Sequence, residues 1–213
     1  MQFLTRTAAF IAAVLMAQAI QAQTVTLDYY FNHEFRINKT TGQKERFHYT
    51  WEDKASSGYS IWGSLFTKNG ATLKSLETAP TAASLKGTDV YIIVDPDTKK
   101  ETENPNYIQA DDIKAIADWV KAGGVLVMLA NDSANVELEH FNHLAAVFGI
   151  HFNLDIRNLV PGDKFELGGL TIPADNPIFT TARKVYMKEI CTIAVTPPAK
   201  AALTDKGDVI IAT

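Results

Sequence analysis

Three apolar segments that each end in a cluster of polar side chains constrain the fold of this chain most strongly. They are Thr24–Asp28, Asp89–Val94 and Val125–Leu129, and carboxylate, amide or hydroxyl groups follow each one within a few residues. Sequence with helical periodicity separates the segments, which predicts parallel strands joined by helical crossovers. Ligands of such sheets bind at the carboxyl ends of the strands. The sequence therefore predicts an α/β fold with a mainly parallel central sheet and a site at one of its edges.

The predicted helices are recognised by apolar residues that recur every three or four positions. The stripes are Ile61, Trp62, Leu65 and Phe66; then Ile113, Ile116, Ala117 and Val120; then Leu138, Phe141, Leu144, Ala145 and Phe148. Ser57 is the predicted N-cap of the first helix, which Asn69-Gly70 ends. Thr72–Leu76 and Ile150–Phe152 are predicted as further strands. Helices between the strands predict a three-layer sandwich.

Two segments interrupt this alternation. Asn32–Ser57 is a long polar excursion, predicted to form a hairpin or a flap because Glu45–Trp51 partly alternates in strand fashion. From Asp155 onward the segments are short and punctuated by proline and glycine, which predicts a β-rich, antiparallel decoration. The chain stops inside a predicted strand, Asp208–Ala212, with no evident partner, so we expect that the domain is truncated.

The first 22 residues have the pattern of a secretory signal. Arg6 precedes an apolar run, Ala8–Ala17, and small residues follow it. A membrane span needs about 20 apolar residues, so a cleaved signal is favoured over the alternative of a membrane anchor. The remaining segment, 23–213, is long enough for a single domain. We expect it to be periplasmic or secreted, without membrane contact after cleavage.

Charge and cysteine content exclude several classes of function. The formal net charge is −4 and there is no basic run, which argues against nucleic acid and anionic membranes as partners. One cysteine, Cys191, excludes an internal disulfide framework. Its apolar, strand-like surroundings predict a buried thiol.

The chain resembles a known family through four long stretches. They are Val25–Asn32, Phe47–Asp53, Tyr91–Thr98, and Gly123–Val127 with Ala130–Ser133. These are similar to the glutamine-amidotransferase-like domain that accompanies unsaturated rhamnogalacturonyl hydrolases in Bacteroidetes. The resemblance covers nearly all of 23–213 and implies a flavodoxin-like α/β sandwich. Family members continue with another turn, strand and aspartate-tryptophan segment, which this sequence lacks; this also favours truncation.

The resemblance does not carry over amidotransferase chemistry. A class I amidotransferase needs a cysteine nucleophile on the turn after a central strand, together with a histidine–glutamate pair. Ala130-Asn131-Asp132-Ser133 occupies that position, and Cys191 lies elsewhere in the sequence. Glutamine hydrolysis is therefore not expected, and no cofactor is implied.

Side chains at the strand ends form the predicted ligand site. They are Tyr30, Asn32, Asp95, Asp97, Asn131, Asp132 and Ser133. Asp95 and Asp97 suit acid–base glycoside chemistry, a Ca²⁺ site, or simply a turn whose side chains bond nearby amides. Carboxylate, amide and phenol groups suit a hydroxyl-rich ligand, and a uronate would need a cation such as Arg36 or Arg46 from the excursion. Tyr29, Tyr30, Trp51 and Trp62 are candidate sugar-stacking surfaces, although Trp62 is expected in the core.

Histidines offer further candidates. His33 with Glu34, and His48 with Asp53, are candidate base–orienter pairs. His140 and His143 share a helix face near Glu137 and Glu139, but a zinc site needs a tighter set, so a solvated face is favoured and no metal is expected.

Three hypotheses of function remain open. The first is an exported accessory domain in pectin (rhamnogalacturonan) degradation, with an oligosaccharide or the unsaturated rhamnogalacturonyl hydrolase as its partner. The second is a glycan or ester hydrolase that uses Asp95 and Asp97 or Asn131–Ser133. The third is a structural module in which these groups only stabilise turns.

Overall fold

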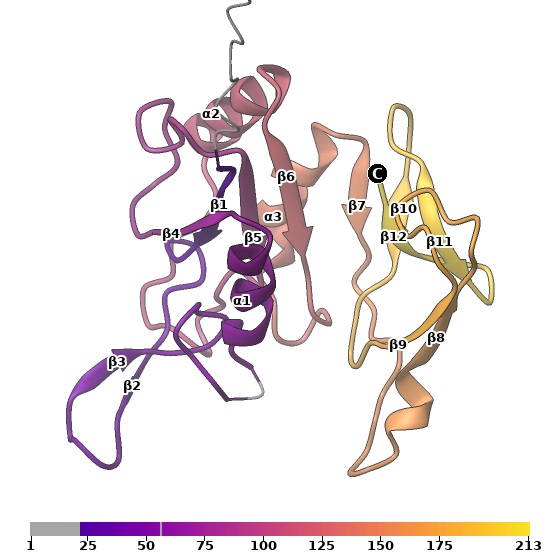
Figure 1. Ribbon diagram of the computed structural model, residues 1–213, viewed down its shortest axis with the longest axis horizontal. Helices are drawn as coiled ribbons and strands as arrows, with labels where there is room; N and C mark the ends of the chain where they lie inside the picture. Colours follow the sequence, from indigo (N-terminus) through magenta and orange to yellow (C-terminus); the bar gives the residue numbers. More distant parts are fainter. Residues whose placement is uncertain (1–21, 56) are drawn as a thin grey trace, which may run out of the picture.

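The computed structural model describes residues 22–55 and 57–213 and is organised around a four-stranded parallel sheet (Figure 1). Its strand order is β4-β1-β5-β6, formed by β1 (Thr24–Asp28), β4 (Thr72–Leu76), β5 (Val90–Val94) and β6 (Val125–Leu129). Every neighbouring pair is parallel. The prediction that these strands are adjacent and parallel is confirmed, and their carboxyl ends meet at one edge.

Helices cover both faces of this sheet, as expected. On one face, Val25, Leu27, Ile92 and Val94 pack with side chains of α1 (Ser60–Lys68). On the other, Tyr91 and Ile93 pack with α2 (Ala110–Lys121) and α3 (Leu138–Ala146). β1 and β5 are buried, but β6 is an edge strand and Val125 is 54% exposed. A continuous apolar run such as Val125–Leu129 predicts a strand that is buried on both faces. For β6 this prediction is wrong, because no strand pairs with its outer edge among the described residues.

Helix α1 differs from its predicted form in two ways. It begins at Ser60 after Tyr59, and not after Ser57. The chain before it is still held to the excursion, because the Tyr49 amide donates to the Ser57 carbonyl at 3.0 Å and the Tyr59 amide to the Thr50 carbonyl at 3.0 Å. Only half of the predicted stripe packs inward: Trp62 and Phe66 contact the apolar cluster, whereas Ile61 and Leu65 are 78% and 52% exposed.

The excursion contains the expected hairpin, in a shorter form. β2 (Phe35–Ile37) and β3 (Lys44–Arg46) pair antiparallel. The predicted strand Glu45–Trp51 ends early because His48 and Tyr49 adopt positive φ angles of 57° and 44°, which turn the chain back toward the sheet.

The C-terminal third is antiparallel, as predicted. β7 (Ile150–Phe152), β10 (Ile193–Val195), β11 (Ala201–Asp205) and β12 (Asp208–Ala212) form a sheet of order β11-β12-β10-β7. The short 3-10 helix η1 (Phe165–Gly168) precedes a two-stranded sheet of β8 (Gly169–Ile172) and β9 (Arg183–Tyr186). β7 therefore pairs with β10 and does not extend the parallel sheet. The last strand, β12, has a partner on each side, contrary to the expectation that it lacks one.

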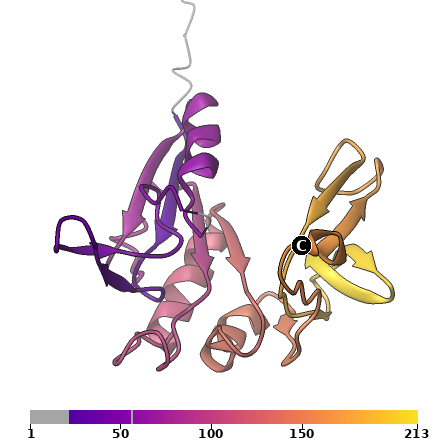
Figure 2. The same cartoon turned by 90° about the horizontal axis from the view of Figure 1, so that it is seen from below.

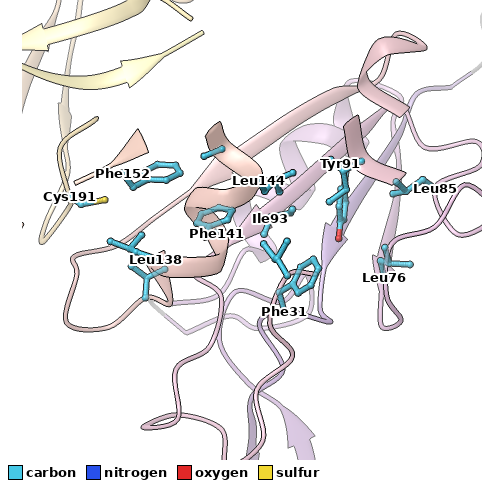
Figure 3. Close-up of a cluster of buried hydrophobic side chains, with 14 residues drawn as sticks. Phe31, Leu76, Leu85, Tyr91, Ile93, Leu138, Phe141, Leu144, Phe152 and Cys191 are labelled. Carbon is cyan, nitrogen blue, oxygen red and sulfur yellow. The ribbon is translucent and has the colours of Figure 1, made fainter. Parts of the chain in front are cut away.

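The antiparallel strands of the C-terminal third, β7 to β12, lie to one side of the α/β layers (Figure 2). A shared apolar cluster joins the two parts, with Phe152 and Cys191 packed near Leu138 and Phe141 of α3 (Figure 3). The Asn142 side chain adds hydrogen bonds of 2.8 and 2.9 Å to the Phe152 backbone. Residues 22–55 and 57–213 contain no helix with the length and hydropathy to cross a membrane. The predicted signal, residues 1–22, falls almost entirely outside the described residues.

Candidate functional site

Asp95 is the point at which the strand ends meet. It follows β5 directly with a φ of 46°, an unfavourable backbone conformation that also occurs at Tyr49. Its Oδ2 accepts a hydrogen bond from Tyr49 Oη at 3.0 Å, and its Oδ1 accepts one from the Asn131 amide at 3.3 Å. Its main-chain carbonyl accepts from Asn32 Nδ2 at 3.0 Å. One residue thus connects the excursion with the ends of β1 and β6.

Burial dominates the electrostatics of this cluster. Asp95 is 6% exposed, and desolvation raises the pKa of its carboxyl to about 7, above the usual 3.8, although the Tyr49 hydroxyl opposes this. Asp28, the last residue of β1, is fully buried, and desolvation raises its pKa to about 6. The Tyr91 hydroxyl donates to Asp28 at 2.6 Å. Asp28 also belongs to the cluster, since it accepts from the Asn32 amide at 3.3 Å, but its place inside an apolar strand gives no sign of this in the sequence.

Asp97 and Asn32 each keep an acceptor atom free. Asp97 Oδ2 accepts from the His33 amide at 2.9 Å and from Thr102 Oγ1 at 2.5 Å, while its Oδ1 has no partner among the described residues. The same holds for Asn32 Oδ1. Both residues are at most 2% exposed, and desolvation raises the pKa of Asp97. These groups lie beneath the surface, so a ligand reaches them only if the covering segments move.

The turn after β6 uses its polar groups locally. Asn131 Oδ1 accepts from the Asp132 amide at 2.8 Å, and Asp132 Oδ1 accepts from the Ala134 amide at 2.8 Å. The Ser133 amide donates to the Asp155 carbonyl at 3.3 Å. Bonds of this kind stabilise turns. Of the predicted site residues, the structure thus brings Asn32, Asp95, Asp97 and the Asn131 backbone together.

The predicted stacking surfaces are buried or partly buried against apolar clusters. Tyr29 is buried, and Tyr30 packs against the main apolar cluster. The ring centres of Trp51 and Trp62 are 6.2 Å apart, and both rings lie between the excursion and α1. Trp62 is partly buried against this apolar cluster, so the expectation that it belongs to the core is met in part. The hypothesis that Tyr29 presents a sugar-stacking face is wrong, because its ring is covered.

The histidine pairs also differ from those predicted. His48 Nδ1 lies 2.6 Å from Glu34 Oε1, so the partner of His48 is Glu34 and not Asp53. His33 contributes only its backbone amide to the strand-end cluster, at Asp97.

The predicted solvated face of α3 holds a compact set of potential ligand atoms. Single atoms of Glu137, Glu139 and His140 all lie within 4.8 Å of one another. Glu137, however, is the N-cap of α3, and its carboxylate accepts from the His140 amide. His140 Nδ1 is 3.0 Å from Glu137 Oε1, and its ring stacks on Tyr107. The Glu137 carboxylate is therefore engaged in capping α3, and the His140 ring is engaged with Glu137 and Tyr107.

A polar cavity of about 350 Å³ lies at the base of the hairpin. Its lining residues come from the excursion alone and include three cations: Arg36, Asn38, Glu45, Arg46, Thr50, Glu52, Asp53, Lys54 and Ala55. Arg36 pairs with Glu45 at 2.7 Å, and Arg46 with Glu52 at 2.5 Å. Lys54 has no ion-pair partner among the described residues. A second hollow, of about 470 Å³, is lined only by the five consecutive residues 163–167, which form one wall on the surface.

The thiol is buried, as predicted. Cys191 is 4% exposed, and desolvation raises its pKa to about 12. Although far along the chain, Cys191 lies beside the turn after β6, where its amide donates to the Asn131 carbonyl at 3.1 Å. A thiol with this pKa is not a thiolate nucleophile at neutral pH.

Comparisons with known proteins relate this chain to others by fold alone. No protein-family model matches the sequence, and no curated protein matches it at a significant level. Among solved structures, the chain is similar to one titled "mmIFT52 N-terminal domain", with a TM-score of 0.56 and 16% sequence identity. The match covers 84% of this chain and 72% of that one. Such a likeness is consistent with the mixed α/β architecture built on a parallel sheet.

Proposed function

We propose that this chain is an exported, non-catalytic domain that recognises carbohydrate during pectin (rhamnogalacturonan) breakdown, alongside an unsaturated rhamnogalacturonyl hydrolase. The observation that carries the proposal is the hairpin cavity. Its guanidinium and ammonium groups can donate hydrogen bonds to sugar hydroxyls, its carboxylates can accept them, and its amide can do both. Its volume is within the range of small-molecule sites, about 300–1,000 Å³. The pathway and the flavodoxin-like assignment rest on the family resemblance.

The state of the thiol and of the two strand-end carboxyl groups supports a binding function. The single thiol is buried and protonated. Asp95 and Asp97 are buried and already accept hydrogen bonds from the backbone and from hydroxyl groups. In this arrangement both carboxylates hold the excursion against the sheet edge, which positions the cavity.

Titration calorimetry of the purified protein with rhamnogalacturonan fragments tests this function. We expect saturable binding and no new reducing ends after long incubation, because Glu45 and Glu52, the two solvent-accessible carboxylates of the cavity, are held in ion pairs with Arg36 and Arg46. Cello-oligosaccharides serve as the control, since they are hydroxyl-rich but carry no uronate or rhamnose. Absence of heat with every pectin fragment would contradict the proposal.

A second function, hydrolysis of a glycan or an ester, is favoured by one observation. The pKa of Asp95, at about 7, makes it a general acid suited to neutral pH. Asp97 and the Asn131–Ser133 turn lie beside it. Release of reducing ends or of carboxylic acid in the incubation just described would favour this alternative over simple recognition.

A further inference from the structure

We propose that the start of α3 binds a divalent transition-metal ion of the zinc type through Glu137, Glu139 and His140. This inference is independent of the proposed carbohydrate recognition, because the three residues lie outside the hairpin cavity. Among residues 22–55 and 57–213, no other three acidic, histidine or cysteine side chains bring ligand atoms within 4.8 Å of one another. The sequence favours a solvated face here, because spacing along the helix does not show that these atoms converge.

The spacing of the ligand atoms suits one small ion. His140 Nδ1 lies 3.0 Å from Glu137 Oε1. Zinc binds imidazole nitrogen and carboxylate oxygen at about 2.0–2.2 Å, so neighbouring ligands in a tetrahedral shell are about 3.4 Å apart. Glu139 is exposed and has room to rotate toward that separation. The His143 ring lies edge-on to the His140 ring, with centres 5.7 Å apart, and offers a further imidazole one turn along the helix.

Capping of α3 leaves Glu137 able to bind an ion. Its two oxygens accept from the His140 amide at 3.3 and 3.2 Å, which are long hydrogen bonds. An ionised carboxylate has about four lone-pair sites, so an oxygen that accepts from an amide can also bind a metal. The Tyr107 ring stacks on the His140 ring with centres 4.7 Å apart and an interplanar angle of 9°. This contact orients the imidazole, as supporting contacts of metal ligands do.

The charge of the cluster favours a cation. Glu137 and Glu139 supply two carboxylates, and neither forms an ion pair with a lysine or an arginine in the described part of the chain; the partner of Glu137 is the His140 imidazole. One divalent ion would neutralise both carboxylates. Imidazole together with carboxylate suits zinc and its neighbours among the transition metals, whereas Ca²⁺ and Mg²⁺ prefer oxygen ligands alone.

A bound ion would fasten the start of the helix. The Glu137 amide donates to the Pro96 carbonyl at 2.9 Å, so the first turn of α3 is joined to the turn after β5. Bonds from one ion to three side chains of this first turn would hold it more firmly. Because an ion that binds only the folded protein shifts the folding equilibrium toward it, zinc should raise the melting temperature.

The experiment is calorimetry of the metal-stripped protein, freed of any histidine tag, with ZnCl₂ and separately with CaCl₂. For the wild type we expect one zinc ion per chain and no saturable binding of calcium. Glu139→Gln and His140→Gln should each lower the zinc affinity by about tenfold or more, because each removes one of three ligands. Glu139→Gln also leaves the Glu137 cap of α3 in place. His151→Gln, at an exposed position of β7 outside the cluster, is the control and should bind zinc as the wild type does.

Each outcome bears on the site. A wild type that binds no zinc would overturn the proposal, and so would equal affinities in the wild type and both cluster variants, since the ion would then bind elsewhere. Calcium bound as tightly as zinc would contradict the role of His140. A melting temperature that rises with ZnCl₂ in the wild type and in His151→Gln, but not in Glu139→Gln, would support the site. Circular dichroism of each variant without metal shows whether the fold is intact.

Discussion

At the scale of single residues, the main feature is a carboxyl group at the end of β5 that accepts hydrogen bonds but has no ion-pair partner among the described residues. Asp95 accepts from Tyr49 and Asn131, but burial outweighs both contacts and raises its pKa to about 7. Asp28 behaves similarly, with a pKa of about 6. Both acids take up protons on folding at mildly acid pH, so protein stability depends on pH.

The sign of this dependence follows from the two pKa values. Between about pH 4 and 7 the folded protein keeps a proton on Asp95 that the unfolded chain has lost, so the free energy of unfolding falls as pH rises. Asp95→Asn cannot ionise and still accepts from Tyr49. We expect it to be more stable than wild type at pH 8 and to have a flatter pH profile in urea titrations. Asp163→Asn, in an exposed loop, is the control. Parallel profiles for wild type and Asp95→Asn would contradict the raised pKa.

The sequence predicted which residues meet at the sheet edge better than it predicted their exposure. Apolar strands of equal direction place Asn32, Asp95 and Asn131 together, and the structure agrees. The sequence could not show that Tyr49 lies over Asp95, because that contact depends on two positive φ angles within the excursion. For the same reason His48 was assigned the wrong partner.

At the scale of elements, continuous apolar runs predicted the bounds of the parallel strands well. Boundaries that depend on tertiary contacts were predicted poorly. β1, β4 and β6 have the predicted bounds, and β5 begins one residue later than predicted. The predicted start of α1 was wrong because the residues before the helix form hydrogen bonds with Tyr49 and Thr50 of the excursion. These bonds outweigh the capping preference of Ser57. The partner of β7 was open, because a short apolar run does not specify which sheet it joins.

The corner between α3 and β7 gives a prediction at this scale. Gly149 has a φ of 77°, and an added Cβ would lie 2.2 Å from the Thr196 carbonyl oxygen. Gly207 has a φ of 93° in the β11–β12 turn, with open space around it. Gly207→Ala should lose roughly 1–2 kcal/mol from backbone strain alone. Gly149→Ala should lose considerably more, because the backbone of the loop after β10 must also move. Urea denaturation measures both, and equal losses would contradict the close approach.

At the scale of the whole molecule, the parallel sheet and the C-terminal antiparallel strands meet along α3 and the turn after β6. Phe152 and Cys191 enter the main apolar cluster, and the Cys191 amide bonds to Asn131. The thiol therefore lies at the junction of the two parts (Figure 3).

This position makes Cys191 a reporter of separation between the two parts. In native buffer at pH 8, a disulfide reagent should react with it slowly, because the thiol is buried and protonated. The rate should rise with urea as the junction opens. Full reaction within seconds in native buffer would contradict the burial. Cys191→Ser should keep oligosaccharide binding, since the hairpin cavity lies in another part of the fold.

The central place of β1 has a consequence for the order in which the chain folds. Thr24 pairs with Thr72, and Val25 with both Leu73 and Val90, so the first strand to be synthesised has no partner until much later sequence follows. Contacts this distant in sequence slow the closure of a sheet. If the proposed export takes place, the same delay would keep the chain unfolded for longer during translocation, because β1 directly follows the predicted signal and pairs only with β4 and β5.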